Sequence, residues 1–237
     1  MTVERIGVIV PARDEAPRLW RCLHAIDRAA AAVGRPVVAV LVLDSCTDDS
    51  AAQAAQLCSA LSVQLAVLTT RCAAAGAARA AGAEWLLELL GTAGTWLATT
   101  DADSAVPPNW LAEQVRQAEL GAAVVAGTVT VRDWEDRPVP VRRRAERDYA
   151  VALASTGHGH VHGANLGISA DWYRQVGGFR PVVCDEDVLL VAAARAAGAA
   201  VAWVSDIAVT TSARVDARAP GGFAAYLDGL DAGEAAS

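Results

Sequence analysis

The stretch TWLATTDAD, residues 95–103, decides the predicted fold. It places an apolar run directly before two carboxylates, Asp101 and Asp103, and Pro107 and Pro108 follow shortly after. This pattern predicts a buried strand, a turn, and then a helix that begins near Pro108. The two aspartates would lie at the carboxyl end of a strand in an open α/β sheet, where such sheets bind ligands. Two carboxylates at that point suit a hard divalent cation, which neutralises phosphate oxygens.

Strands that alternate with helices precede this stretch. Short apolar runs predict strands over 6–10, 37–43 and 63–68. Helices are expected between Glu15 and Gly34, from the cap residues 45–50 through Ala60, and over 73–90. This order predicts an α/β protein with a mostly parallel central sheet flanked by helices and a Rossmann-like nucleotide-binding first half.

The second half of the chain is less regular. Helices are expected over 111–120, 142–155 and 188–197, with a short one from Ala170 to Gly177. Strands are expected over 122–131 and 199–204, and none is predicted between the glycine-rich loop at 157–163 and Ala170. We treat 1–231 as one domain with two halves, 5–120 and 121–215, and 232–237 as a disordered tail.

Charge and cysteine usage limit the possible functions. The formal net charge is -7, which excludes nucleic acid as a partner because a phosphate backbone demands a basic surface. All 20 basic residues are arginine, so lysine Schiff-base chemistry and a P-loop lysine are excluded. Five cysteines without a C-x-x-C pair predict reduced thiols in a cytoplasmic protein. No apolar stretch is long enough to span a bilayer, and peripheral binding to a membrane is left open.

Five motifs in sequence order resemble those of the family-2 glycosyltransferases, which have the GT-A fold. The resemblance covers roughly residues 5–215, and Asp14 replaces the asparagine usual in the first motif. The motifs are VIVPARDE at 8–15, LDSCTDDS at 43–50, DAD at 101–103, GANLGI at 163–168 with GGF at 177–179, and the acidic pair Glu186-Asp187.

The resemblance implies a nucleotide-diphosphate sugar as donor and a divalent metal, Mn²⁺ or Mg²⁺, as cofactor. It also implies that 5–120 form the nucleotide-sugar half and 121–215 the acceptor and catalytic half. Asp103 with Asp101 would hold the metal beside the diphosphate, and Arg79 resembles a basic residue that approaches the nucleotide. The Asp44 carboxylate can accept from a nucleobase N–H or a ribose hydroxyl. The full set implied to bind the nucleotide sugar is Pro11, Ala12, Arg13, Glu15, Asp44, Arg79, Asp101 and Ala102.

The resemblance also implies an inverting transfer to a hydroxyl acceptor, either a small molecule or a lipid-linked one. Asp187 would be the general base, and Asp185 and Glu186 compete with it for that role. The implied acceptor-binding residues are His162, Gly163, Ala164 and Asn165. Two departures stand out: Leu189 occupies a position where the family often has aspartate, and residues 210–212 lack the histidine that some relatives supply.

Several motifs have alternative interpretations. His158, His160 and His162 alternate, so in an extended chain they share a face and could bind zinc instead of acceptor. The arginines at 142–147 are typical of a solvated helix face, with a phosphorylated acceptor or an anionic membrane as the alternative. For Asp48 and Asp49 we favour helix capping.

Two other function classes compete with a glycosyltransferase. A sugar-phosphate nucleotidyltransferase needs a glycine-rich loop after the first strand, and residues 11–15 contain no glycine. A non-catalytic nucleotide- or carbohydrate-binding module would not need Asp101, Asp103 and Asp187, which are all present. The sequence therefore favours the transferase.

Overall fold

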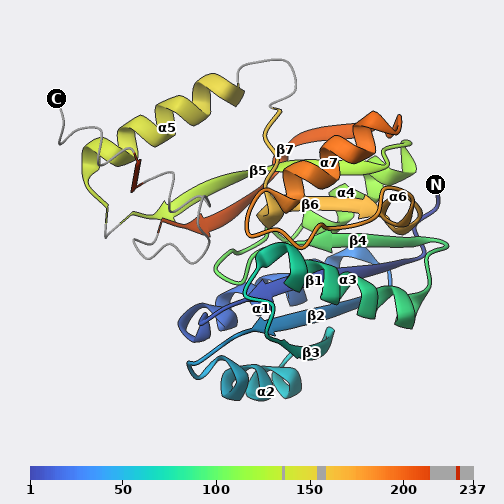
Figure 1. Ribbon diagram of the computed structural model, residues 1–237, viewed down its shortest axis with the longest axis horizontal. Helices are drawn as coiled ribbons and strands as arrows, with labels where there is room; N and C mark the ends of the chain where they lie inside the picture. Colours follow the sequence, from blue (N-terminus) through green and yellow to red (C-terminus); the bar gives the residue numbers. More distant parts are fainter. Residues whose placement is uncertain (135–136, 154–158, 214–227, 230–237) are drawn as a thin grey trace.

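The computed structural model describes residues 1–134, 137–153, 159–213 and 228–229. A seven-stranded sheet with the order β3-β2-β1-β4-β6-β5-β7 runs through it, and helices cover both faces (Figure 1). The strands are β1 (Arg5–Ala12), β2 (Val37–Asp44), β3 (Gln64–Thr70), β4 (Thr95–Thr99), β5 (Val124–Asp133), β6 (Leu166–Ser169) and β7 (Val201–Ser212). The helices are α1 (Ala16–Val33), α2 (Ser50–Ala60), α3 (Ala75–Leu90), α4 (Trp110–Glu119), α5 (Val139–Leu153), the 3-10 turn η1 (Gly163–Asn165), α6 (Ala170–Gln175) and α7 (Glu186–Ala196). This architecture confirms the predicted fold class. The predicted tail at 232–237 lies outside the described residues.

Strand β1 lies between two hydrophobic cores, one on each face of the sheet. Val8 and Val10 pack with α1, α2 and α4, whereas Ile9 packs with α3, α6 and α7. Successive side chains of a strand point to opposite faces, so an apolar run buried throughout is a strand covered on both sides. Strands β1 to β4 pair in parallel, which brings their carboxyl ends to one edge of the sheet.

Strand β6 is the main departure from the sequence prediction, which placed no strand there. Its residues are buried and pair antiparallel with both β4 and β5. Gly167 permits the close packing, since an added Cβ would lie 2.1 Å from Oε1 of Gln114. So short a run carries too little periodicity to distinguish a strand from a loop. Pairing with β4 and β5 is therefore what identifies these residues as a strand.

Strand β7 also differs from the prediction, which ended it at Val204. The strand continues to Ser212. Its pairing with β5 is interrupted at residues 205–208, opposite Thr128, and resumes at Val209. This continuation carries Thr211 and Ser212 to the turn that holds Asp103. The end of β7 therefore contributes to the candidate site described below.

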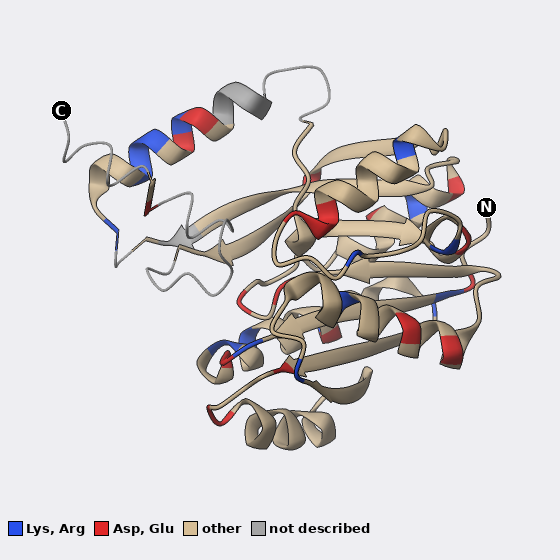
Figure 2. Cartoon of the chain, in the orientation of Figure 1, with Lys and Arg blue, Asp and Glu red and all other residues tan. Residues whose placement is uncertain are grey.

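Helix α5 lies beside the projecting ends of β5 and β7 (Figure 1). A small separate core joins it to them, formed by Trp134, Val141, Ala145 and Ala213. The helix begins at Val139, earlier than predicted, and residue 155 lies outside the described residues. The arginines at 142–144 are exposed along it (Figure 2).

In the described part of the chain, none of the helices combines the length and the apolar character that crossing a membrane requires.

The Asp48 carboxylate joins the beginnings of two helices. Its Oδ1 accepts the N–H of Ser50, the first residue of α2, and its Oδ2 accepts the N–H of Ala16, the first residue of α1, both at 3.0 Å. This confirms the capping interpretation for Asp48, whereas the Asp49 side chain makes no cap hydrogen bond. The loops after β1 and β2 are thereby held together.

We expect Asp48→Ala to lower the free energy of unfolding by about 1–2 kcal/mol, because first-turn N–H groups of both helices lose an acceptor. The adjacent Asp49→Ala should change it by less than about 0.5 kcal/mol. Burial raises the pKa of Asp48, but the hydrogen bonds from Ser50 and Ala16 outweigh it and hold the pKa below its usual range. A lowered folded pKa gives stabilisation that is present at neutral pH and lost on acidification. Urea titrations should therefore show the two variants converging at acid pH.

Candidate active site

A cavity of about 1180 Å³ opens where β1, β2 and β4 end, and it continues between β5, α5 and β7. Most of the residues predicted to form the site line it: Pro11, Ala12, Arg13, Glu15, Asp44, Arg79, Asp101, Ala102, Asp103, His162, Gly163, Ala164, Asp185, Glu186 and Asp187. Asn165 is absent from this lining. Because the carboxyl ends of parallel strands meet at one edge, residues far apart in sequence come together here.

The loop after β1 forms one wall and is held in a fixed conformation. Asp14 has a φ of 53°, and its Oδ1 accepts the N–H groups of Thr47 at 2.7 Å and Asp48 at 3.2 Å. The Thr47 N–H, more than any other interaction, lowers the pKa of Asp14. Aspartate at the position of the usual asparagine therefore ties the loop after β1 to the loop after β2.

Asp44 ends β2 and organises the loop that follows β3. Its carboxylate accepts the N–H of Cys72 at 2.7 Å, the N–H of Ala74 at 3.1 Å and the hydroxyl of Thr70 at 3.1 Å. Burial raises the pKa of this carboxyl. The hydrogen bonds, which include one from the Ala73 backbone, outweigh the effect of burial and hold the pKa below its usual range. The interaction predicted with a nucleobase stays a prediction, and it would have to share a carboxylate already used by the protein.

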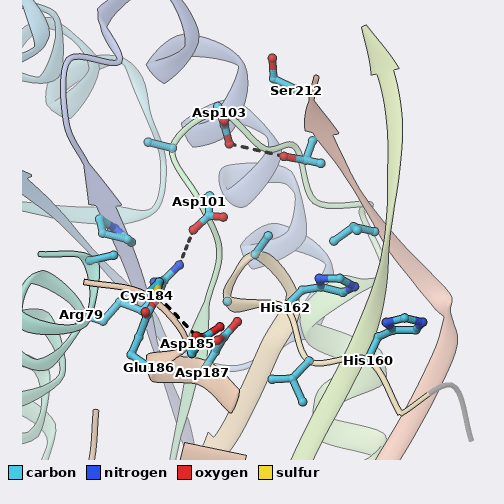
Figure 3. A pocket seen from close by; sticks show the side chains of 18 of the residues that line it. Arg79, Asp101, Asp103, His160, His162, Cys184, Asp185, Glu186, Asp187 and Ser212 are labelled. Carbon is cyan, nitrogen blue, oxygen red and sulfur yellow. Dashed lines mark hydrogen bonds and ion pairs between the residues drawn. The ribbon is translucent and has the colours of Figure 1, made fainter. Parts of the chain in front are cut away.

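Asp101 and Asp103 lie in the turn after β4. Asp101 forms an ion pair with the Arg79 guanidinium, and its side chain is 40% exposed. The Oδ1 of Asp103 accepts the Ser104 hydroxyl at 3.2 Å and the Thr211 hydroxyl at 3.5 Å. Figure 3 shows both carboxylates along the same cavity, with Asp103 toward the end of β7. Thr211 was not among the predicted site residues because sequence alone ended β7 too early.

Arg79 links the two halves of the protein. It is buried on α3, its Nε donates to the Thr99 hydroxyl at 3.2 Å, and its terminal nitrogens pair with Asp101 and Glu186. A Cβ added at Gly163 would lie 2.5 Å from this guanidinium, so a larger residue there would displace Arg79 from its ion pairs. Arg79 therefore connects α3 to the turn after β4 and to the beginning of α7, which sequence spacing alone could not reveal. Its approach to a nucleotide stays a prediction.

The three neighbouring carboxylates at the beginning of α7 have different surroundings. Glu186 is buried against Arg79, whereas Asp185 is exposed and has a φ of 63°. Asp187 is half-buried, and burial raises its pKa more than Arg79 and the N–H groups of Val188 and Gly163 lower it. Asp187 thus lines the cavity without the buried ion pair that occupies Glu186, and its predicted role as general base stays a prediction.

The histidine-containing loop meets α5 at the far side of the cavity. The Tyr149 hydroxyl accepts the Val129 N–H at 2.9 Å and lies 3.3 Å from Nε2 of His162. The His160 and His162 rings stack with centroids 5.8 Å apart. His158 lies outside the described residues. Tyr149 and Trp134, which also line this side, were not predicted as site residues.

Asn165 has a structural position. It is fully buried, its amide nitrogen donates to the carbonyls of Thr128 at 2.8 Å and Ile207 at 2.7 Å, and its oxygen accepts from Trp110 at 2.8 Å. These bonds join β5, β7 and α4. Direct contact of Asn165 with an acceptor stays a prediction, and this placement favours a role in holding the neighbouring Gly163 and Ala164 in position.

The residues around Asp103 suit a hard cation. Carboxylate and hydroxyl oxygens are the ligands that Mg²⁺ and Mn²⁺ prefer, and Mg²⁺ is commonly held by one or two carboxylates together with substrate phosphates. Among the described residues, Asp14, Cys46 and Asp48 form a tighter group of potential ligands. Its carboxylates already accept backbone N–H groups of the loops, which accounts for their proximity.

A family model described as Glycosyl transferase family 2 matches residues 7–177. Similar solved structures include TarS of S. aureus in complex with UDP-GlcNAc (TM-score 0.67, 14% identity, 90% of this chain and 60% of that chain covered). Another is the mannosyltransferase PcManGT from Pyrobaculum calidifontis with GDP-Man and Mn²⁺ (TM-score 0.65, 18% identity, 98% and 70% covered). This chain thus spans about 60% of the TarS chain, and no curated protein matches its sequence. At these identities the likeness shows a GT-A-type fold.

Proposed function

This chain belongs to glycosyltransferase family 2, and from that premise we propose that it transfers a sugar from a nucleotide-diphosphate donor to a hydroxyl acceptor with inversion. The observation that carries the proposal is the meeting of Asp101, Asp103 and Asp187 in one cavity at the carboxyl edge of the sheet. The carboxylates come from two halves of the chain, and Arg79 holds the halves together. A binding module has no need of such an arrangement.

Each group has a role in the proposed reaction. Asp187 takes the proton of the acceptor hydroxyl as that oxygen attacks the anomeric carbon from the face opposite the leaving nucleotide. A single displacement of this kind inverts the anomeric configuration, as in inverting glycosidases. Asp103 and Asp101 would hold a divalent metal, which supplies electrostatic stabilisation of the departing diphosphate. Pro11 to Glu15 and Asp44 shape the space for the nucleoside.

The donor can be identified by thermal melting against a panel of nucleoside diphosphates and nucleotide sugars, with and without Mn²⁺. UDP-GlcNAc and GDP-Man belong in the panel because the similar structures contain them. A ligand present at about 100 times its Kd adds about 2.7 kcal/mol to the free energy of unfolding. For a domain of this size that corresponds to a rise in Tm of roughly 5–10 °C. We expect one nucleotide to give such a rise only with Mn²⁺.

The products then distinguish the competing functions. A glycosyltransferase releases a nucleoside diphosphate when acceptor is added, and a nucleotidyltransferase releases pyrophosphate from a nucleoside triphosphate. A binding module would show the rise in Tm with no turnover of any donor. Pyrophosphate release, or the absence of a metal-dependent rise with every nucleotide tested, would contradict the proposal.

A further inference from the structure

The cavity extends well beyond the residues assigned to the donor. Its volume of about 1180 Å³ exceeds the roughly 300–1,000 Å³ typical of small-molecule sites. The additional space lies between β5, α5 and the loop before η1, and we call it the ring compartment. Figure 3 shows His162 between Asp187 and His160, so the compartment leads away from the carboxylate of the proposed base. The residues that define it are Val131, Trp134, Ala145, Glu146, Asp148, Tyr149, His160 and His162.

Three rings form one wall of the ring compartment. Tyr149 and His160 have centroids 5.0 Å apart, and the His160 and His162 planes are within 10° of parallel. The Val129 N–H holds the Tyr149 hydroxyl, so this ring is anchored to the sheet. Aromatic faces bind flat, apolar surfaces such as another ring. Exposed Val183 and Val188 add apolar surface to the cavity lining.

Charge limits what can enter this compartment. Among the described residues that line the whole cavity, arginine occurs only at Arg13 and Arg79, and Arg79 is already paired with two carboxylates. The compartment instead has Glu146 and Asp148 in its wall, and Asp185 and Asp187 lie where it meets the catalytic end. Glu146 pairs with Arg142, which does not itself line the cavity. A phosphate there would thus face carboxylates, and no guanidinium lines the compartment in the described part of the chain. The exposed arginines at 142–144 do not line the cavity.

We propose that the acceptor is an uncharged hydroxylated molecule with a flat ring face, such as a neutral glycoside, which stacks in the ring compartment and carries no phosphate. The inference rests on the proposed function and makes it more specific. The bound ring lies on His160 and Tyr149, and the reacting hydroxyl points toward Asp187. Phosphate-linked acceptors are disfavoured by the carboxylates around them.

The test uses 4-nitrophenyl glycosides of common hexoses and the corresponding 6-phosphates as acceptor probes, with the donor found by melting. Release of nucleoside diphosphate gives kcat and KM for each probe. The neutral probes should have the higher kcat/KM in the wild type. His160→Ala should raise the KM for neutral probes by about two- to tenfold, the contribution of one ring contact. The donor-induced rise in Tm should be retained.

The matched control is His24→Ala. His24 also packs on an aromatic ring, that of Trp20, with the same centroid distance of 5.0 Å, but it lies on α1 outside the cavity. It should leave every KM unchanged. A second variant, Glu146→Arg, breaks only an exposed pair with Arg142 and adds a cation to the compartment wall. It should increase the kcat/KM of the phosphorylated probes relative to the neutral ones.

Three results would overturn this inference. They are a preference of the wild type for phosphorylated probes, equal KM values in the His160 and His24 variants, and failure of every neutral probe to bind in saturation-transfer NMR while the donor still raises Tm. Failure of every nucleotide to raise Tm is a different result, because it contradicts the proposed function itself.

Discussion

Asp187→Asn should lower kcat by about 10²- to 10⁴-fold, the usual contribution of a general base, while the donor-induced rise in Tm stays at the wild-type level. The asparagine side chain has nearly the same shape, and its oxygen can still accept from the N–H groups of Val188 and Gly163, as the carboxylate does. It cannot take a proton. The geometry therefore persists while the chemistry is lost.

The pH dependence gives a second measurement for the same residue. Burial raises the pKa of Asp187, and a general base acts only when it is deprotonated. The acid limb of the wild-type kcat/KM profile should thus lie above about pH 3.9, the ordinary pKa of aspartate, and the limb should vanish in the variant. A carboxyl group with a raised folded pKa loses stability as pH rises through that pKa. Asp187→Asn should consequently melt no lower than the wild type at neutral pH.

Asp185→Asn is the matched control, since it removes the same charge two residues away from an exposed side chain. We expect it to retain most of the activity. Full activity of Asp187→Asn combined with loss of activity in Asp185→Asn would transfer the role of base to Asp185. Glu186 is unsuited as a comparison because its removal leaves Arg79 without one of its buried partners, and that defect destabilises the fold.

The sequence sufficed for the first half of the fold because local signals agree with tertiary structure there. Strands β1, β2 and β4 are short, mostly apolar runs that each end in a turn, and their parallel order follows from the alternation with helices. The aspartates at the ends of β2 and β4 could therefore be placed at one edge before the structure was known. The later half depends on pairings between distant segments, and β6 is buried by neighbours that its own four residues do not reveal.

The candidate site shows the same division. Residues next to strand ends, such as Asp101 and Glu15, are brought to the cavity by the sheet itself. The buried pairing of Arg79 with Glu186 joins residues 107 positions apart, and sequence spacing contains no trace of it. Tyr149 lies on α5, whose exposed arginines at 142–144 favoured the interpretation of a solvated helix face. The hydrogen bond from the Val129 N–H of β5 holds its hydroxyl beside the cavity.

Asp103→Ala should abolish the Mn²⁺-dependent part of the donor-induced rise in Tm and lower kcat/KM by about 10²- to 10³-fold. Asp103 tests the metal more cleanly than Asp101 does, because Asp101 is also a partner of buried Arg79. The Ser104 and Thr211 hydroxyls that contact Asp103 also bond to each other at 3.0 Å, so the turn keeps an internal tie after the substitution. Mn²⁺ binding can be measured directly by EPR in the presence of the nucleoside diphosphate.

Asp171→Ala, which removes an exposed aspartate from α6, supplies the control for net charge and should bind Mn²⁺ and donor as the wild type does. An Asp103→Ala variant that bound the nucleotide sugar equally well with Mn²⁺ would show that the cation is held elsewhere. The carboxylates of Asp14 and Asp48, which form a group with Cys46, already accept backbone N–H groups of the loops. We therefore expect no Mn²⁺ binding to that group in the variant. The diphosphate of the donor would supply the metal ligands that the protein does not. Loss of Mn²⁺ binding in Asp103→Ala therefore tests the metal site and the donor site together.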